Sequence, residues 1–491
     1  MKIKEVENER RSDSVKITDE MVSVPGVHII DAPTGAGKSR AVKSITVPTL
    51  VVSPRCALVD QQAEDTFAEN KNITVRTIQG LAYMDDPKAY LSRFDVVVVD
   101  ESHDLISGSD YDDKMIQTTK IVLRAPKLIC LTATDIGLER LFGLLGRTAT
   151  VHKYADDVWK TLAGGCFGFI PNVDTAIDVI DKKLKRGEKV LYFTDNTADI
   201  ERIQQFYLYD KKVLPVVSES NPKHKRLCGD RTKEINALIK SKQFPAGVRV
   251  VCATRCMDVG LNIIDKSVTC VVCNIYELAC LRQCLGRKRL DREAGEQVDF
   301  YCVLPTGQAL TKRKAKTEKL LAQFEQYQND RDKYIALREG VKLDASEIVY
   351  HTYENGQRVE KVDWCRLVYA EYLMNTIYKT PTVTAWKLLV EKMLGCQGIP
   401  METIEKQQKE VWQYEQTKKL RGMKLNDKQQ KSLLISIYED DLKTPQAFNR
   451  LWQERGWDFH IDGDLDGGST YITDENGKKK RKRNRNAWMV S

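Results

Sequence analysis

The stretch that most constrains the fold is Val27–Ser39, which reads VHIIDAPTGAGKS. An apolar run typical of a buried strand ends in a turn of small residues, and a helical pattern follows. Gly35 and Gly37 allow the backbone to curl so that its N–H groups face an anion. We interpret this strand–turn–helix as a phosphate-binding loop, although the strict motif has glycine where this chain has Ala32.

Within this loop, Lys38 supplies a mobile positive charge for β- and γ-phosphates, and Ser39 supplies a hydroxyl for Mg²⁺. The residues expected to line the phosphates are Thr34, Gly35, Ala36, Gly37, Lys38 and Ser39.

A second stretch, Phe94–His103, reads FDVVVVDESH. Four valines predict a buried strand with two carboxylates at its tip. Asp100 is placed to hold Mg²⁺, and Glu101 to orient and deprotonate a water that attacks a γ-phosphate. The alternative is a buried strand that ends in ordinary polar loop residues. The phosphate loop upstream favours the nucleotide site.

Strand-like and helix-like segments alternate over residues 25–155 and again over 156–306, which predicts two parallel sheets covered by helices. The second region has no phosphate loop of its own. In the first region, residues 25–155, we expect strands at 27–30, 50–53, 73–77, 96–99 and 128–132, and helices at 37–45, 55–67 and 112–123. In the second we expect strands at 190–194, 213–217, 248–253 and 268–274, and helices at 175–184, 200–206 and 233–240.

Five stretches in the first region are similar, in order, to motifs of superfamily 2 DExH-box helicases. Motif I of that family resembles Ala32–Ser39, and motif II resembles Asp100–His103. Two motifs that lie between these resemble Ser53–Gln61 and Thr77–Leu81, and the motif after motif II resembles Leu131–Thr134. The resemblance implies tandem RecA-like P-loop domains, with ATP and Mg²⁺ in the cleft and nucleic acid across both lobes. It also implies nucleic-acid contacts at Pro54, Arg55 and Thr77, and coupling of ATP state to strand grip through His103, Thr132 and Thr134.

The second region carries two further stretches that resemble this family. In Val250–Ile263, similar to motif V, Thr254 is expected to face a backbone phosphate and Gly260 to allow close approach of the main chain. Asp258 is expected on the nucleotide side of the cleft.

In Leu281–Arg289, similar to motif VI, the resemblance implies catalytic roles for Gln283, Arg287 and Arg289. An arginine that reaches across the cleft stabilises charge on the transferring phosphoryl group. The second arginine follows the first by two positions rather than the usual three, which leaves Arg289 and Arg292 as alternatives for the second finger. The competing interpretation is a basic helix face.

Composition changes after residue 306. Six of the seven tryptophans lie beyond this point, and we expect most of them to be core residues of a mostly helical accessory domain over 307–475. Asn355-Gly356 between two alternating runs predicts a hairpin. The expected helices are 311–339, 364–378, 384–394, 404–420, 428–438 and 445–455. Residues 476–491 are expected to form a basic tail whose run Lys478–Arg485 is a strand, a disordered arm or a targeting signal, and residues 1–24 an N-terminal extension.

The bulk composition limits the setting. The chain has 491 residues, a formal net charge of +8 and 13 cysteines, many of them in apolar runs. That usage suits a reducing compartment better than a disulfide framework. Because the sequence shows neither an apolar signal core nor a membrane-length apolar segment, we expect a soluble intracellular protein. We expect it in the cytoplasm of a bacterial cell or host, or in a nucleus because of the basic tail.

The sequence therefore predicts an ATP-hydrolysing helicase or translocase that acts on nucleic acid, with DNA favoured over RNA, in replication, recombination or repair. A narrower resemblance is to phage, plasmid and viral DNA helicases, including the herpesvirus origin-binding type. Replication or recombination proteins are expected to bind through the C-terminal domain. The alternatives are a replication-initiator ATPase that switches DNA binding without unwinding and, ranked lower, a packaging-type motor with a nuclease domain.

Overall fold

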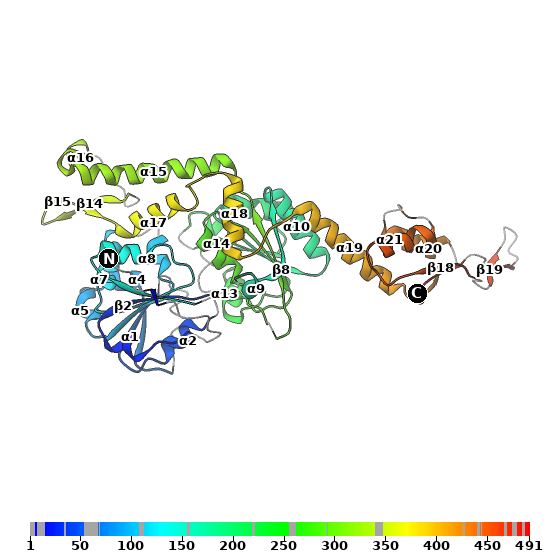
Figure 1. Ribbon diagram of the computed structural model, residues 1–491, viewed down its shortest axis with the longest axis horizontal. Helices are drawn as coiled ribbons and strands as arrows, with labels where there is room; N and C mark the ends of the chain where they lie inside the picture. The colour runs from blue at the N-terminus through cyan, green and yellow to red at the C-terminus, as the bar shows by residue number, and fades with distance from the viewer. Residues whose placement is uncertain are drawn as a thin grey trace. The chain divides into compact units, whose positions relative to one another are not determined.

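A computed structural model of the chain divides into two compact units, Met1–Gly398 and Ile399–Ser491, which we describe separately (Figure 1). No helix in the described part of the chain is long and apolar enough to cross a membrane. The structure describes residues 5–6, 15–33, 36–53, 67, 69–107, 112–154, 158–218, 221–254, 262–291, 293–338, 347–425, 428–438, 442, 444–465, 469–473, 479–483 and 487–491.

Lobe 1, by which we mean the first parallel sheet and the helices that cover it, has the strand order β1-β7-β2-β6-β5-β3-β4. The strands are β1 (Glu5–Val6), β2 (Gly26–Asp31), β3 (Thr49–Ser53), β4 (Ile73–Thr77), β5 (Val96–Val99), β6 (Lys127–Thr132) and β7 (Ala149–Lys153). The helices are α1 (Asp19–Ser23), α2 (Lys38–Lys43), α4 (Ile78–Ala82), α5 (Pro87–Leu91), α6 (His103–Ser107), α7 (Asp113–Leu123) and α8 (Leu138–Leu144). All four valines of β5 are buried, as the apolar run predicts. The helix expected over 55–67 lies outside the described residues, except for residue 67.

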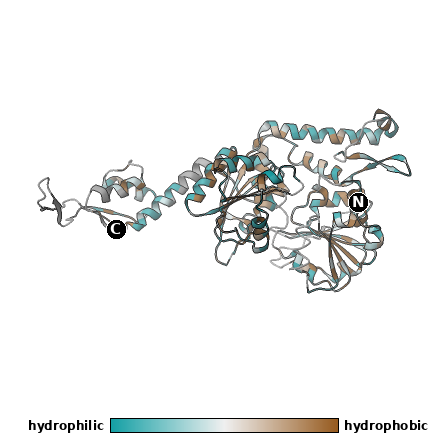
Figure 2. Cartoon of the chain, turned by 180° about the vertical axis from the view of Figure 1, so that it is seen from behind, coloured by the Kyte–Doolittle hydropathy of each residue, from teal (hydrophilic) through white to brown (hydrophobic). Residues whose placement is uncertain are grey.

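Lobe 2, by which we mean the second parallel sheet and the helices that cover it, has its strands β8–β13 in the order β10-β11-β9-β12-β13-β8. Its strands are β8 (Gly164–Ile170), β9 (Lys189–Thr194), β10 (Val213–Val216), β11 (Val250–Ala253), β12 (Val268–Asn274) and β13 (Val298–Val303). Its helices are α9 (Val158–Leu162), α10 (Val173–Lys185), α11 (Thr197–Phe206), α12 (His224–Cys228), α13 (Thr232–Ser241) and α14 (Leu278–Leu285). The predicted fold class, tandem RecA-like domains followed by a mostly helical region, is confirmed. Figure 2 shows hydrophobic residues along the strands and a largely hydrophilic α15.

The accessory segment of the first unit follows lobe 2. It comprises α15 (Gly307–Asn329), α16 (Arg331–Leu337), β14 (Val349–Glu354), β15 (Gln357–Val362), α17 (Trp364–Asn375) and α18 (Val383–Leu394). The predicted hairpin is confirmed, and both turn residues, Asn355 and Gly356, have positive φ. The single helix expected over 311–339 is wrong, because Asp330 adopts φ −152° and caps a new helix by accepting a hydrogen bond from Lys333 N.

The second unit contains a small core of aromatic residues, including the fully buried Phe448 and Trp452. Its elements are β16 (Ile399–Pro400), α19 (Met401–Lys419), β17 (Lys424–Leu425), α20 (Lys428–Ile437), α21 (Pro445–Glu454), β18 (Ile461–Leu465), β19 (Ser469–Thr473), β20 (Lys479–Arg483) and β21 (Ala487–Val490). Of the three interpretations of the basic run, the structure has a strand, because β20 pairs with β19. Strand β21 pairs with β17 and β18 and contributes Trp488 and Val490 to the core, so residues 476–491 include a structural strand of this unit.

Candidate nucleotide site between the two lobes

The phosphate loop joins the end of β2 to α2. Gly37 has φ 85°, a left-handed conformation that favours glycine, and α2 starts at Lys38. The Lys38 side chain is 8% exposed, and its ammonium donates to Ala32 O at 2.6 Å and to Pro33 O at 3.0 Å. The loop carbonyls therefore hold this charge beside the turn in which a phosphate would sit. Two predicted loop residues, Thr34 and Gly35, lie outside the described residues.

Three carboxylates surround the Lys38 ammonium. Burial lowers the pKa of Lys38, and the negative charges of Glu101, Asp100 and Asp31 oppose that shift. Asp31 is a site residue that the sequence analysis did not assign, and burial raises its pKa with a further contribution from Asp135. Its signal in the sequence is its position as the last residue of the apolar run, because ligands in such sheets bind at the carboxyl ends of strands.

The predicted catalytic carboxylates lie at the tip of β5. Asp100 is buried and accepts a hydrogen bond from Glu101 N at 3.0 Å. Glu101 has φ 46°, a conformation that costs a non-glycine residue on the order of 1–3 kcal/mol and tends to persist at functional sites. Within the described part of the chain, the buried Oε2 atom of Glu101 has no hydrogen-bond donor, and it lies 3.7 Å from His103 Nδ1. A carboxylate oxygen of this kind can accept a proton from a bound water.

The electrostatic environment keeps Glu101 ionised. Burial would raise the pKa of this carboxyl, but nearby positive charges outweigh burial and hold the pKa below its ordinary value. The groups that lower it are His103, Lys38, Arg287 and Arg289. Since two of them belong to lobe 2, the charge balance of the site depends on both lobes.

A chain of polar contacts crosses from lobe 1 to lobe 2. Thr134 N donates to Thr132 Oγ1 at 3.0 Å, and the same hydroxyl is 3.1 Å from His103 Nδ1. On its other side, His103 Nε2 contacts the side-chain amide of Gln283, which lies on α14 of lobe 2. The structure therefore brings the three predicted coupling residues into one line with Gln283.

The two predicted arginines extend from the end of α14. Arg287 is 3% exposed and its Nε donates to Gln283 O at 3.2 Å, while its Nη2 has no hydrogen-bond acceptor among the described residues. Arg289 Nε donates to Asn262 Oδ1 at 2.7 Å, a contact that the sequence analysis did not assign. Burial, with repulsion from Arg287, lowers the pKa of Arg289 to about 10, so the Arg289 side chain is still cationic at neutral pH. Arg292 lies outside the described residues, and the choice of the second finger stays open.

The residues predicted to contact nucleic acid are described only in part. Thr77 is the last residue of β4 and caps α4, its hydroxyl accepting a hydrogen bond from Gly80 N at 2.7 Å. Thr254 follows β11, where its N–H donates to Val216 O at 3.0 Å. Both lie at the carboxyl ends of strands, as predicted. The other residues predicted to contact nucleic acid, Pro54, Arg55 and Gly260, lie outside the described residues, as does Asp258, which was expected on the nucleotide side of the cleft.

The donor set fits a nucleotide with its cation better than a free-standing metal site. No cluster of three or more His, Cys, Asp or Glu suited to a metal ion occurs within the described ranges. Asp100 and the half-buried Ser39 are the residues that could share Mg²⁺ with phosphate oxygens, the usual way that this ion is held. Glu101 Oε2 and Arg287 Nη2, which have no hydrogen-bond partner among the described residues, are buried polar atoms suited to a water and a phosphoryl group.

No protein-family model matches the chain, and no curated protein matches it significantly. Among solved structures, S. cerevisiae Dbp5 bound to RNA and ADP BeF3 is similar at 14% identity and a TM-score of 0.41, covering 58% of this chain and 81% of that one. The Escherichia coli DEAH/RHA helicase HrpB is similar at 17% identity and a TM-score of 0.38, covering 72% of this chain and 48% of that one. The Mycobacterium smegmatis helicase Lhr bound to ssDNA and AMP-PNP is similar at 15% identity and a TM-score of 0.33, covering 60% of this chain and 42% of that one. Because identity and overlap are this low, the function of the chain has to be inferred from its own residues.

Proposed function

We propose that the chain is an ATP-dependent nucleic-acid helicase or translocase with a superfamily 2 DExH-type site. The observation that supports this most is the contact between the His103 ring of lobe 1 and the Gln283 amide of lobe 2, beside Glu101 and Arg287. An ATPase site completed by a second lobe links hydrolysis to lobe movement. Lobe movement can in turn shift a bound strand.

Each residue has a defined task in this proposal. Lys38 and Ser39 bind the phosphates and Mg²⁺, and Asp100 holds the same ion. Glu101 accepts a proton from the attacking water, for which its lowered pKa keeps it ionised. Arg287 offsets the charge that develops on the transferring phosphoryl group, a role that can contribute ~10³–10⁵ in rate. ATP supplies the phosphoryl group.

The nucleic-acid assignment rests on strand-end residues and on charge. Thr77 ends β4 of lobe 1 and Thr254 follows β11 of lobe 2, and the net charge of +8 favours a phosphate backbone as partner. Strand β20 of the second unit adds five consecutive basic residues, KKRKR. We infer DNA as the preferred substrate, in replication, recombination or repair, with protein partners at the C-terminal region, on the narrower resemblance to phage, plasmid and viral helicases.

Two assays on the purified full chain test the proposal together. ATP turnover is measured with matched single- and double-stranded DNA and RNA, and strand displacement is measured on partial duplexes of the same sequences. We expect nucleic acid to stimulate turnover and ATP to drive displacement, with DNA the better substrate. Stimulated turnover without displacement would refute the helicase and leave a translocase or an initiator-type switch. Absence of ATP turnover would refute the whole proposal.

A further inference from the structure

The accessory segment of the first unit contacts both lobes, starting from lobe 2. The first turns of α15 are anchored there, where Leu310 is fully buried in the lobe 2 core. The guanidinium of Arg313 lies 5.1 Å from the centroid of the Tyr276 ring and 3.5 Å from the Asp195 carboxylate. In Figure 1, α15 extends from the neighbourhood of α18 to the hairpin β14–β15.

The far half of α15 is anchored in a different core. Phe324 packs with Ile348, Val349 and Leu367 of the accessory segment, and Leu144 of α8 in lobe 1 packs against the same cluster. The hairpin binds lobe 1 as well, since Gln117 Nε2 donates to the Tyr350 hydroxyl at 2.8 Å. One continuous helix therefore joins lobe 2 to a cluster that is fixed on lobe 1.

Helix α17 is fixed on lobe 1, where it contacts α6 and α8. Val368 is buried within the lobe 1 core, and a Cβ on Gly137, which has φ 109°, would lie 2.7 Å from Val368 Cγ1. Arg140 donates two hydrogen bonds to Glu371, at 3.0 and 3.1 Å.

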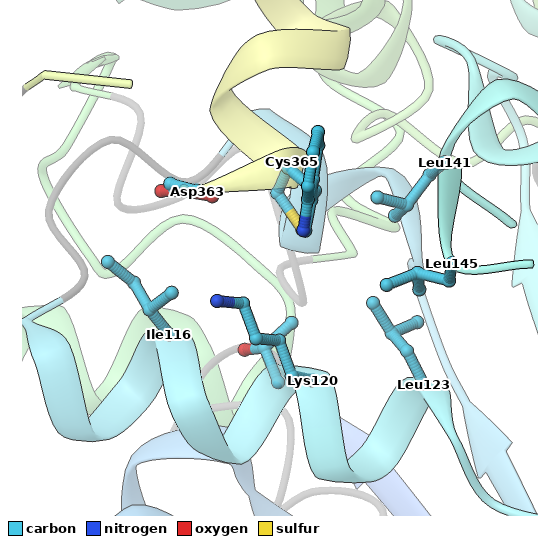
Figure 3. Close-up of a pocket in the computed structure, with 9 residues that line it drawn as sticks. Ile116, Lys120, Leu123, Leu141, Leu145, Asp363 and Cys365 are labelled. Atoms are coloured by element: carbon cyan, nitrogen blue, oxygen red, sulfur yellow. The ribbon is translucent and has the colours of Figure 1, made fainter. Parts of the chain in front are cut away.

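Packing at the start of α17 is tight. Figure 3 shows side chains of α7 and of the α8 region facing Asp363 and Cys365 across a cavity with a volume of about 10 Å³. That volume admits about one water, so α17 is seated on lobe 1 without room for a ligand.

Helix α18 then returns to lobe 2. Trp386 is fully buried in the lobe 2 core, and its indole N–H donates to Tyr276 O at 2.9 Å. Arg313 of α15 contacts the ring of the same tyrosine, which precedes α14. Both lobe 2 anchors therefore hold the base of the helix that carries Gln283 and leads to Arg287. The lobe 1 anchor holds α6, which starts at His103.

We propose that α15, α17 and α18 form a strut that holds the two lobes together and positions Gln283 and Arg287 against His103 and Glu101. Opening the cleft requires α15 to bend or one anchor to detach, and a continuous hydrogen-bonded helix resists bending. The strut residues are positioning residues, because they act through α6 and α14. The catalytic part of this inference rests on the proposed ATPase function, whereas the geometric part does not.

The test weakens α15 between its anchors without removing a contact. Ala315→Gly with Lys316→Gly changes two exposed positions between Arg313 and the accessory core. Glu325→Gly with Gln326→Gly is the matched control, since it changes two exposed positions of the same helix beyond Phe324. Both pairs lose similar helix propensity, but only the first makes the bridging span flexible.

Three readouts separate positioning from general damage. For the first pair we expect kcat without nucleic acid to fall about tenfold, which corresponds to about 1.4 kcal/mol, with the KM for ATP unchanged. Saturating nucleic acid should restore kcat, because it bridges the lobes itself. Spin labels on non-natural residues at Lys71 and Lys185, exposed on lobes 1 and 2, should give a broader distance distribution than in wild type or control.

Equal kcat and equal distance distributions in the two glycine pairs would overturn the strut. A fall in kcat that nucleic acid does not restore would also contradict it. If the wild type shows no ATP turnover, the proposed function fails. The distance measurement alone then decides whether the strut holds the lobes.

Discussion

Glu101→Gln is the substitution whose outcome the geometry of the site determines most closely. The amide keeps the size of the side chain but cannot accept the proton of the attacking water. Removal of a general base typically costs ~10²–10⁴ in rate, or about 2.7–5.5 kcal/mol of barrier. We expect kcat for ATP to fall within that range.

The same substitution should leave ATP binding intact or tighter. In the wild type the Glu101 carboxylate lies among basic side chains, Lys38, Arg287 and Arg289, which help to lower its pKa. Once the carboxylate is neutral, the phosphates of ATP become the main counter-charge for those groups. ATP should therefore raise the melting temperature of the variant at least as much as that of the wild type.

The pKa shift also predicts the pH profile. The pKa of Glu101 is lowered from the ordinary value of 4.5, so the carboxylate is already ionised throughout the neutral range. Wild-type kcat should show no loss from protonation of this group until the pH falls below that value. An acid limb near pH 6 assigned to the group would contradict the pKa direction.

The assay is single-turnover ATP hydrolysis with nucleotide affinity measured in parallel. Glu188→Gln is the matched control, because Glu188 pairs with the buried Lys183 ammonium at 2.7 Å on a lobe 2 turn that carries no predicted site residue. The control should lose stability and keep its hydrolysis rate. Near-normal hydrolysis by Glu101→Gln, or an equal loss in the control, would refute the assignment of Glu101 as the base.

Three further predictions concern stability and binding. Trp386→Phe removes a buried indole hydrogen bond and leaves a small cavity, so the free energy of unfolding should fall by about 1–3 kcal/mol in thermal melts. An unchanged melting temperature would contradict the role of Trp386 as an anchor of α18 on lobe 2. Burial lowers the pKa of His28 and His152, whose ring nitrogens are 3.2 Å apart, while Glu20 opposes the shift in both. The unfolded chain therefore binds protons first, so the stability of lobe 1 should drop as the pH falls through 6.5, and His28→Gln should reduce that drop. Lys480→Ala with Lys482→Ala in β20 should weaken nucleic-acid binding and reduce the slope of log K against log salt concentration by about 2. An unchanged slope would mean that β20 does not contact nucleic acid.

Local patterns predicted the elements that carry the site. The valine run of β5 and the loop before Lys38 are contiguous in sequence, and parallel strands bring their carboxyl ends to one edge. The hairpin at Asn355-Gly356 is likewise encoded in its own turn residues. These features depend on neighbours within a few positions, which is why the sequence alone located them.

Long-range packing could not be predicted in the same way. The contact between Val368 and Gly137 joins residues that are far apart in the chain, and the sequence pattern of neither segment predicts this contact. The break at Asp330 depends on one cap within an otherwise helical pattern. Strand β21 looked like part of a charged tail, and only its pairing with β17 and β18 makes Trp488 a core residue. Removing residues 478–491 would therefore damage the second unit, and the paired lysine substitutions are the cleaner test of its charge.

We propose that one ATPase site is completed by Arg287 of the second lobe. Single-turnover hydrolysis by Arg287→Ala, with ATP affinity and nucleic-acid stimulation recorded on the same preparation, tests it most directly. We predict a loss of ~10³–10⁵ in rate, retained ATP binding and no stimulation by nucleic acid. Hydrolysis at the wild-type rate would refute this role of Arg287, because lobe 1 would then contain a complete site by itself.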